Sequence, residues 1–329
     1  MAAMKTVSEL PTKVQLVDID ADMAGQRVDN FLISRLKGVP KSHIYRLLRK
    51  GEVRVNKGRV KPERKLSAGD IVRIPPVRVA ESKAQVRPGQ GLVKVLESAI
   101  LYETASLMVV NKPAGLAVHG GSGINLGLIE ALREMRPDAR FLELVHRLDR
   151  GTSGCVLIAK KRSMLRHLQQ ALREKSLGVA GQHGITKIYQ ALAIGRWPKK
   201  RKVVDKPLQR YEVAGGERIV KVSPQGKQSI TEFSILEQYT DATLLEARPI
   251  TGRTHQIRVH AQFTGHPLLG DDKYGVDETN AEMKEKGLKR LFLHASELTF
   301  YLPDSSEPTT VKAPLGPDLQ TILNQLSSP

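Results

Sequence analysis

The sequence predicts an α+β protein whose catalytic domain has a mixed, mostly antiparallel central sheet flanked by helices. Short apolar or alternating runs follow one another without regularly repeating helices between them, which disfavours a doubly wound sheet. Two of these runs, 229–236 and 242–248, predict a β-hairpin. Leucines at helical spacing mark a helix over residues 162–175.

The charge balance points to a polyanionic partner. The 329 residues include 52 Lys and Arg against 34 Asp and Glu, a net charge of +18, which favours a nucleic acid. An anionic membrane is the rival partner. However, the sequence has no apolar run of about 18 residues and no basic amphipathic helix at a terminus. Residues 1–13 lack a hydrophobic signal core, so we expect a cytoplasmic protein without a membrane partner.

The number of cysteines further limits the kinds of protein and metal site that the sequence can form. The single cysteine, Cys155, excludes an internal disulfide framework and a cysteine zinc cluster. It lies in an apolar run, which is typical of a small core residue rather than a reactive thiol.

Changes in composition divide the chain into four parts. Residues 1–24 form a tail or a leading strand, and residues 25–76 form a small unit with two helices followed by short strands. A proline pair and a polar run predict a linker over 77–92. The remainder, 93–329, is the large domain.

The small unit carries much of the excess charge, with 14 Lys and Arg against 4 Asp and Glu in residues 25–75. A solvated helix face is the ordinary explanation for such charges, but their clustering favours contact with an RNA backbone. The residues expected to make it are Arg46, Arg49, Lys50, Arg54 and Lys57.

One carboxylate stands out in the large domain. Asp149 lies between Arg147 and Arg150, and a Gly-Thr-Ser-Gly turn leads from it into the apolar run 155–159, which predicts a buried strand. Nearby positive charge favours an ionised carboxyl group, and a charged carboxylate on a loop held by a rigid strand can act as a nucleophile or a base. A structural ion pair is the plainer interpretation of an isolated Asp-Arg neighbour.

The residues around Asp149 favour the catalytic interpretation over the structural ion pair. H-R-L-D-R-G-T-S-G-C-V-L-I-A-K at 146–160 resembles the catalytic motif of the RluA family of pseudouridine synthases. Further likeness lies in V-V-N-K-P-A-G-L at 109–116, K-x-Y-x-A-L at 187–192 and the long string at 248–275. The openings G-x-R-V-D-x-F-L and K-G-E-V-R-V-N in the small unit are similar to an S-four-like RNA-binding domain. Residues 38–57 are most similar to the branch called RluC, which modifies 23S ribosomal RNA.

The resemblance implies isomerisation of uridine to pseudouridine in folded RNA, a redox-neutral reaction with no metal and no cofactor. The target base must first be flipped out of its stack. Asp149 would attack the flipped nucleotide, at either the sugar or the base, and Arg258 would pair with it. Tyr189 would stack on the uracil or relay the C5 proton, and Arg147 would fill the space the base leaves. His146, Arg150 and His255 are the other residues expected to contact substrate.

The long string at 248–275 also predicts local structure. Thr251 or Thr254 can cap a helix that ends at Gly265. On such a helix His255, Arg258 and Gln262 share one face. The spacing of His255 and His260 does not match a metalloprotease zinc site.

Three other functions are alternatives to uridine isomerisation. A glycoside hydrolase needs two carboxylates, and Glu143 is the one acid near Asp149. A methyltransferase needs a nucleotide-binding glycine loop, which fails because Leu126 takes the third glycine position. A non-catalytic rRNA-binding or ribosome-assembly factor is the most serious alternative, because the basic unit alone could supply affinity. The sequence does not name the target uridines or explain an extra loop at 178–184, and a monomer is the default expectation.

Overall fold

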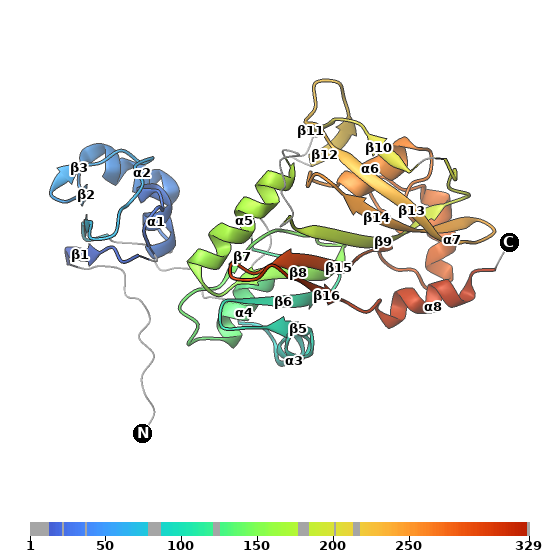
Figure 1. Cartoon of the computed structure of the whole chain (residues 1–329), viewed down its shortest axis with the longest axis horizontal. Coiled ribbons are helices and arrows are strands. Elements are labelled where there is room, and N and C mark those ends of the chain that lie inside the picture. The colour runs from blue at the N-terminus through green and yellow to red at the C-terminus, as the bar shows by residue number, and fades with distance from the viewer. Residues whose placement is uncertain are drawn as a thin grey trace. The chain divides into compact units, whose positions relative to one another are not determined.

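The structure, a computed structural model, describes residues 13–21, 23–36, 38–77, 87–120, 126–176, 184–200, 202–212 and 218–327. The glycine patch that failed the nucleotide-loop pattern and most of the extra loop at 178–184 lie outside these residues, as does the predicted linker from 78 to 86. The chain divides into two compact units, residues 1–86 and 87–329 (Figure 1).

The first unit packs two helices against a four-stranded sheet with the strand order β1-β4-β2-β3. Its helices and strands are β1 (Gln15–Asp18), α1 (Val28–Arg35), α2 (Lys41–Lys50), β2 (Arg54–Val55), β3 (Gly58–Arg59) and β4 (Ile71–Ile74). The leading segment of the chain thus supplies a strand, since β1 pairs with β4. Helix α2 ends as predicted at Gly51, which adopts the left-handed conformation with a φ of 69°.

The second unit is built on a ten-stranded sheet. The order of its main path is β10-β13-β14-β9-β15-β8-β6-β5, with β16 beside β15 and β7 beside β8. The strands are β5 (Ile100–Glu103), β6 (Leu107–Lys112), β7 (Glu143–Leu144), β8 (Ser153–Ala159), β9 (Thr186–Ile194), β10 (Val203–Asp205), β13 (Ile230–Gln238), β14 (Ala242–Pro249), β15 (Leu293–Tyr301) and β16 (Pro308–Lys312). Among the described pairings β8 with β15 is parallel and the others are antiparallel, so the predicted mixed, mostly antiparallel sheet is confirmed.

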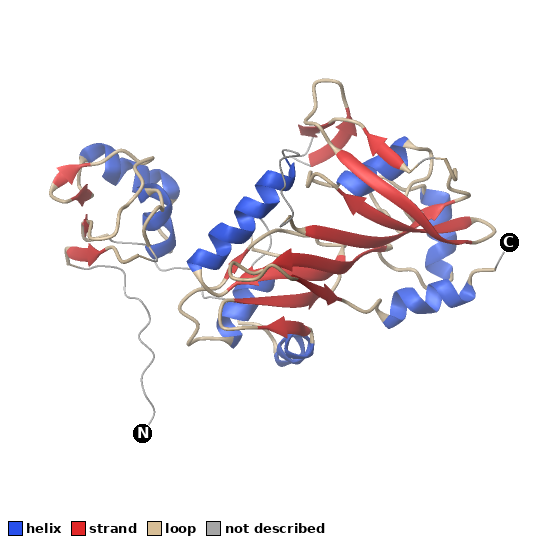
Figure 2. Cartoon of the chain, viewed as in Figure 1, coloured by secondary structure: helices blue, strands red, loops and turns tan. Residues whose placement is uncertain are grey.

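Helices cover both faces of this sheet (Figure 2). They are α3 (Gln90–Ser98), α4 (Leu128–Met135), α5 (Arg162–Ser176), α6 (Gln256–Phe263), α7 (Asp277–Glu285) and α8 (Pro317–Gln325). Helix α3 begins three residues before position 93, where the sequence predicts the start of the large domain. A two-stranded hairpin, β11 (Leu208–Glu212) with β12 (Arg218–Val222), lies beside α6.

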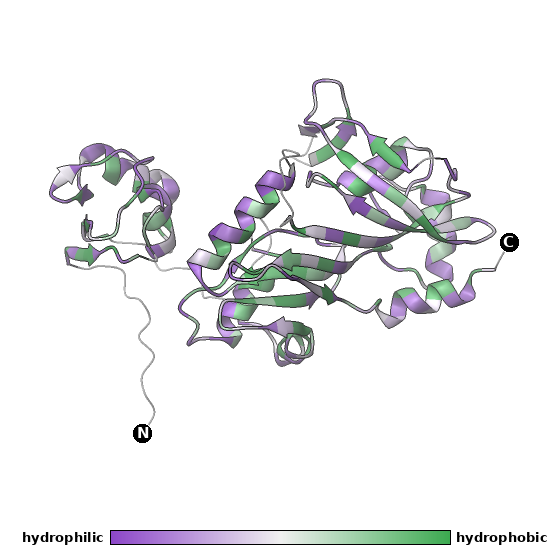
Figure 3. Cartoon of the chain, in the orientation of Figure 1, coloured by the Kyte–Doolittle hydropathy of each residue, from purple (hydrophilic) through white to green (hydrophobic). Residues whose placement is uncertain are grey.

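Strand β8 is buried on both faces, which explains its unbroken apolar sequence (Figure 3). Val156 and Ile158 belong to the core that includes α4, whereas Leu157 belongs to the core that includes α5. Successive side chains of a strand point to opposite faces, so α4 and α5 must cover opposite sides of β8. The loop before β8, which carries Asp149, is thereby fixed to the centre of the unit.

No helix in the described part of the chain is long and apolar enough to cross a membrane.

The parallel pairing of β8 and β15 requires glycine at position 154. Gly154 has a φ of +109°, and a Cβ atom there would overlap the backbone of Ala295. We expect Gly154→Ala to lower the free energy of unfolding by at least about 3 kcal/mol, because it combines left-handed strain with a backbone clash. Thermal unfolding measures this directly.

The matched control is Gly265→Ala. Gly265 has a φ of +83°, but a Cβ atom there would meet nothing within 4 Å. Gly265→Ala should lower the free energy of unfolding by about 1 kcal/mol, because it adds backbone strain without a clash. Equal losses in the two variants would show that the close approach to Ala295 does not matter.

Candidate active site

A pocket of about 280 Å³ opens where three segments of the second unit meet. The loop before β8 supplies Asp149, strand β9 supplies Tyr189, and the loop leading into α6 supplies His255 together with Arg258 from the helix itself. Asp149 is the one carboxylate among the residues that line the pocket. A flipped base of modest size could therefore meet a single acid surrounded by cations and apolar walls.

The loop that carries Asp149 is tied to the turn after β6 by a buried lysine. The ammonium group of Lys112 donates hydrogen bonds to the carbonyl oxygens of Pro113 at 2.8 Å, Leu116 at 2.8 Å and Arg150 at 3.3 Å. Burial lowers the pKa of Lys112 to about 7, and the charge of Asp149 opposes that shift. The three acceptors compensate for burying the ammonium group and hold the loop in place.

The arginines beside Asp149 behave differently from what the sequence predicts. Arg150 is exposed, and its Nε donates to the carbonyl of Gly115 at 2.9 Å. Arg147 is also exposed and lines the pocket. The ion pairs that the structure gives for Asp149 within the described residues are with His255 and Arg258, and neither Arg147 nor Arg150 forms one with it.

Arg258 contacts three acids among the described residues, Asp271, Asp272 and Asp149, and pairs most tightly with Asp271. Its Nε and Nη2 donate to the two carboxylate oxygens of Asp271 at 2.7 and 2.6 Å, a buried bidentate pair. Its Nη1 lies 3.8 Å from Asp149 Oδ2, too far for a hydrogen bond. Burial alone would lower the pKa of Arg258, but Asp271 outweighs it and raises that pKa. The predicted pair of Arg258 and Asp149 is thus a loose ion pair, and the tight partner of Arg258 is Asp271.

His255 also faces Asp149, and a hydrogen-bond chain sets its tautomer. The backbone N–H of Val220 donates to the hydroxyl of Tyr274 at 3.0 Å, which leaves the hydroxyl proton for His255 Nδ1 at 2.7 Å. The proton of a neutral His255 is then on Nε2, which lies 3.8 Å from Asp149 Oδ2. Burial lowers the pKa of His255, although Asp149 opposes that shift.

Helix α6 begins later than predicted. It starts at Gln256, and His255 precedes it with a left-handed φ of 54°. Thr251 does not cap the helix, because its hydroxyl donates to the side chain of Gln256 at 2.7 Å and accepts from the N–H of Ile230. Gln262 is exposed and does not line the pocket, so it does not share the site with His255 as expected.

Tyr189 and His146 complete the inner wall. Burial raises the pKa of Tyr189, and the charge of Asp149 raises it further, so the hydroxyl stays protonated. His146 Nε2 accepts from the N–H of Leu157 at 3.1 Å, which places its proton on Nδ1. That Nδ1 is buried without a hydrogen-bond partner in the described part of the chain. Burial lowers the pKa of His146 well below its usual value, so it stays neutral.

Sequence reasoning missed several residues that line this pocket or hold the residues that do. Asp271 and Tyr274 lie in the string at 248–275, but their side chains received no role because nothing in the spacing shows which acid Arg258 would choose. Lys175 and Lys187 were missed as well, and both line the pocket. The signal for Lys187 was available, since it stands two residues before Tyr189 on one strand and therefore on the same face.

The residues expected to touch the RNA backbone are all exposed and lie in the first unit. Arg46, Arg49 and Lys50 are on α2, Arg54 is on β2, and Lys57 is in the β2–β3 turn. They form the solvent-facing side of elements whose apolar residues, such as Ile44 and Leu48, make the core.

The comparisons with known proteins agree with this geometry. Residues 106–263 match the RNA pseudouridylate synthase family and residues 26–72 match the S4 domain. The chain is 56% identical to ribosomal large subunit pseudouridine synthase C of Pasteurella multocida (strain Pm70), over 95% of this chain and 94% of the relative. The chain belongs to the RNA pseudouridylate synthase family. It is therefore a pseudouridine synthase, an isomerase, as its motifs suggest.

Other relatives support the same family membership. Ribosomal large subunit pseudouridine synthase C of Vibrio vulnificus (strain CMCP6) is 54% identical over 97% of this chain and 99% of its own length. The solved structure of human RNA pseudouridylate synthase domain containing 4 aligns with a TM-score of 0.57 at 27% identity, covering 73% of this chain and 97% of that one. A non-catalytic RNA-binding factor is therefore not favoured.

The buried pair of Arg258 and Asp271 makes a prediction about stability. Asp271→Ala leaves the guanidinium group buried without its bidentate partner and should cost about 3–5 kcal/mol, measured by thermal unfolding. Asp271→Asn, which keeps the shape, should lose less. Asp272 is the matched control, since its side chain is 95% exposed and only 3.4 Å from the same Nη2. If Asp272→Ala destabilises as much as Asp271→Ala, the division of roles between the two acids is wrong.

Proposed function

We propose that the chain isomerises specific uridines of large-subunit (23S) ribosomal RNA to pseudouridine, with Asp149 as the nucleophile. The observation that carries the proposal is a 20% exposed carboxylate at the pocket, with Nε2 of His255 and Nη1 of Arg258 each 3.8 Å from its Oδ2. The names of the relatives support ribosomal RNA as the substrate. In this proposal residues 25–76 supply RNA affinity, residues 93–329 supply the chemistry, and 77–92 link them.

The reaction conserves all atoms. The N1–C1′ bond of uridine breaks, the uracil turns, and a C5–C1′ bond forms. The proton lost from C5 is balanced by a proton gained at N1. No electron leaves the nucleotide, so the chain's own groups need only attack, orient the base and move a proton.

The loose contact between Asp149 and its cations suits a nucleophile. A carboxylate locked in a bidentate pair has both oxygens engaged, whereas neither oxygen of Asp149 accepts a hydrogen bond from the described residues. The proton on His255 Nε2 and the Nη1 of Arg258 still stabilise its charge across 3.8 Å. Asp149 is therefore oriented by the two contacts and remains reachable from the pocket.

The remaining groups receive roles from their positions. Tyr189 offers its ring to the uracil and a protonated hydroxyl close to Asp149, so it can pack on the base and carry a proton. His146 offers a buried Nδ1 donor to a uracil oxygen. Exposed Arg147, beside Asp149, can enter the space that the flipped base leaves in the RNA. Arg150 instead holds the loop to Gly115. We propose a monomer, because the described residues of one chain supply all these groups. We propose that it acts in the cytoplasm, because the names of the relatives point to ribosomal RNA as the substrate.

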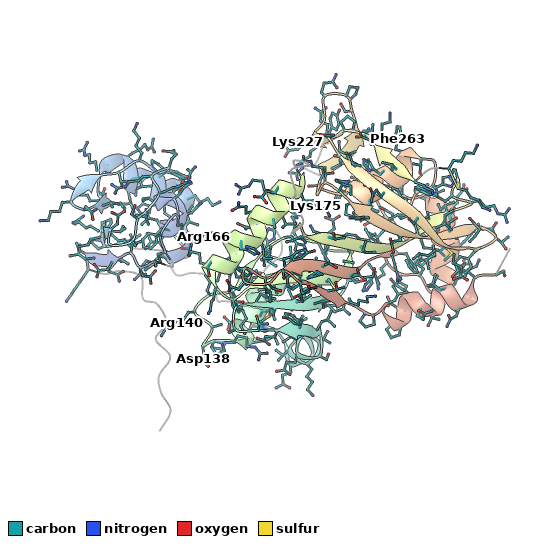
Figure 4. The ribbon with its side chains drawn as sticks, viewed as in Figure 1. Asp138, Arg140, Arg166, Lys175, Lys227 and Phe263 are labelled. Carbon is teal, nitrogen blue, oxygen red and sulfur yellow. The ribbon has the colours of Figure 1, made fainter. Side chains whose placement is uncertain are left out.

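Asp149→Asn tests the nucleophile. The amide keeps the shape of the side chain but cannot attack, so we expect tritium release from C5-labelled uridine RNA to fall at least about 10³-fold. The dissociation constant for that RNA should stay within about threefold of the wild-type value, because the charge of the basic unit is unchanged. Asp138→Asn is the control, since Asp138 is exposed and lies away from the pocket lining (Figure 4). Turnover that survives Asp149→Asn would remove the assignment.

Arg258→Lys tests whether catalysis needs one guanidinium group that contacts both Asp271 and Asp149. A lysine ammonium group cannot hold Asp271 in a fork and also present a third nitrogen to Asp149. We expect at least about 10²-fold slower single-turnover conversion with nearly unchanged RNA binding. Arg140→Lys, at an exposed position labelled in Figure 4, should behave like the wild type. Full activity in Arg258→Lys would show that the fork has no part in catalysis.

A further inference from the structure

Two lysines of the pocket have no part in the chemistry described above. Lys175 stands at the last turn of α5 (Figure 4), and Lys187 is the second residue of β9. Both line the same pocket as Asp149, and both are partly buried. Within the described residues the structure gives neither ammonium group a hydrogen bond or an ion pair, which is unusual for partly buried cations.

The surrounding charges do not neutralise this pair. The acid that acts on Lys175 is Glu232, which already lies 3.6 Å from the guanidinium group of Arg248. The charge of Lys175 in turn disfavours the charged form of Lys187, and Lys187 does the same to His146. This end of the pocket is therefore a cluster of positive charge that lacks an anion.

Burial and mutual repulsion both disfavour the charged forms of Lys175 and Lys187, and a bound anion would offset both effects. Burial lowers the pKa of Lys175 and of Lys187 to about 8 in each case, and the neighbouring cations add to the shift. The negative end of the α5 dipole offsets part of the cost for Lys175, but Lys187 lies on a strand and has no such help. An anion placed between the two ammonium groups would restore the charged form of both.

The position of the cluster indicates what the anion is. Lys187 and Tyr189 are two residues apart on β9, so their side chains point to the same face about 7 Å apart. The charge of Asp149 acts directly on Tyr189. A nucleotide whose base packs on Tyr189 beside Asp149 would thus carry its backbone toward Lys187 and Lys175.

We propose that Lys175 and Lys187 form a phosphodiester-binding subsite that holds the RNA backbone next to the flipped nucleotide. The inference rests on the proposed function for the identity of the ligand, but its test needs no turnover. The subsite is a binding device: it fixes the strand by one linkage, while Asp149 and Tyr189 act on the base.

The test uses the full-length protein and the trinucleotide UpUpU, in which either internal linkage is the natural diester or a neutral methylphosphonate. Binding is measured by titration. The wild-type protein should bind the charged trinucleotide about tenfold more tightly than the analogue that is neutral at the contacted linkage. Lys187→Met and Lys175→Met should each lose most of that preference. Lys187→Arg, which keeps the charge, should retain it.

A matched control and the salt dependence sharpen the result. Lys94→Met removes an exposed lysine on α3, outside the pocket lining, and should leave the preference unchanged. For a longer single strand, the slope of log affinity against log salt concentration should fall by about 0.7 in the Lys187→Met protein, one released counterion.

Two outcomes would overturn the proposal. One is a wild-type protein that binds the charged and neutral trinucleotides equally. The other is a pair of methionine variants that keep the full preference, which would leave the lysines a structural role at most. Failure of the proposed function would look different: the preference would be present while rRNA fragments showed no conversion of uridine. With a converted rRNA fragment, the methionine variants should raise KM and leave the single-turnover rate at saturation within about threefold of the wild type.

Discussion

One guanidinium group that pairs tightly with Asp271 and only loosely with Asp149 determines the character of this site. Asp271 takes two nitrogens of Arg258 in hydrogen bonds of 2.6 and 2.7 Å, and the third nitrogen is left 3.8 Å from Asp149. If Asp149 instead formed the bidentate pair with Arg258, its carboxylate oxygens would be engaged in hydrogen bonds and its reactivity would be reduced. Because Asp271 forms the bidentate pair, Arg258 is a fixed positive charge near Asp149 that does not immobilise it.

The rest of the second unit keeps that geometry rigid. Gln256, the first residue of α6, joins the helix to β13 through hydrogen bonds to Ile230 and Thr231, so Arg258 lies on an anchored helix. On the opposite wall, the three carbonyl contacts of Lys112 hold the Asp149 loop, and the strand after it is buried on both faces. A site made of loops thus gains the precision of the strands and helices on which those loops rest.

Much of this could be predicted from sequence because the informative signals are local. Periodic apolar residues gave the helices of the first unit and the hairpin of β13 and β14, and the strings around Asp149 and Arg258 marked the two walls of the pocket. What could not be predicted was decided by distance in space. The competition of Asp271 and Asp149 for Arg258, the left-handed backbone of His255 and the pairing of Tyr274 with Val220 all depend on which surfaces meet after folding. Lys175 and Lys187 come from different elements, and their shared pocket is not visible in their spacing.

The parallel pairing of β8 with β15 has a consequence for how the protein comes into being. Ser153 meets His294 across 141 positions of sequence, so the loop of Asp149 cannot reach its final support until nearly the whole chain has been synthesised. The first unit lies within the first 86 residues, and its β1–β4 pairing is available as soon as Ile74 has been synthesised. During synthesis on the ribosome, the protein therefore completes its RNA-binding unit early and its active site last. A prematurely terminated chain that ends before β15 would occupy the transcript without altering it, and would compete with the finished enzyme for the same target.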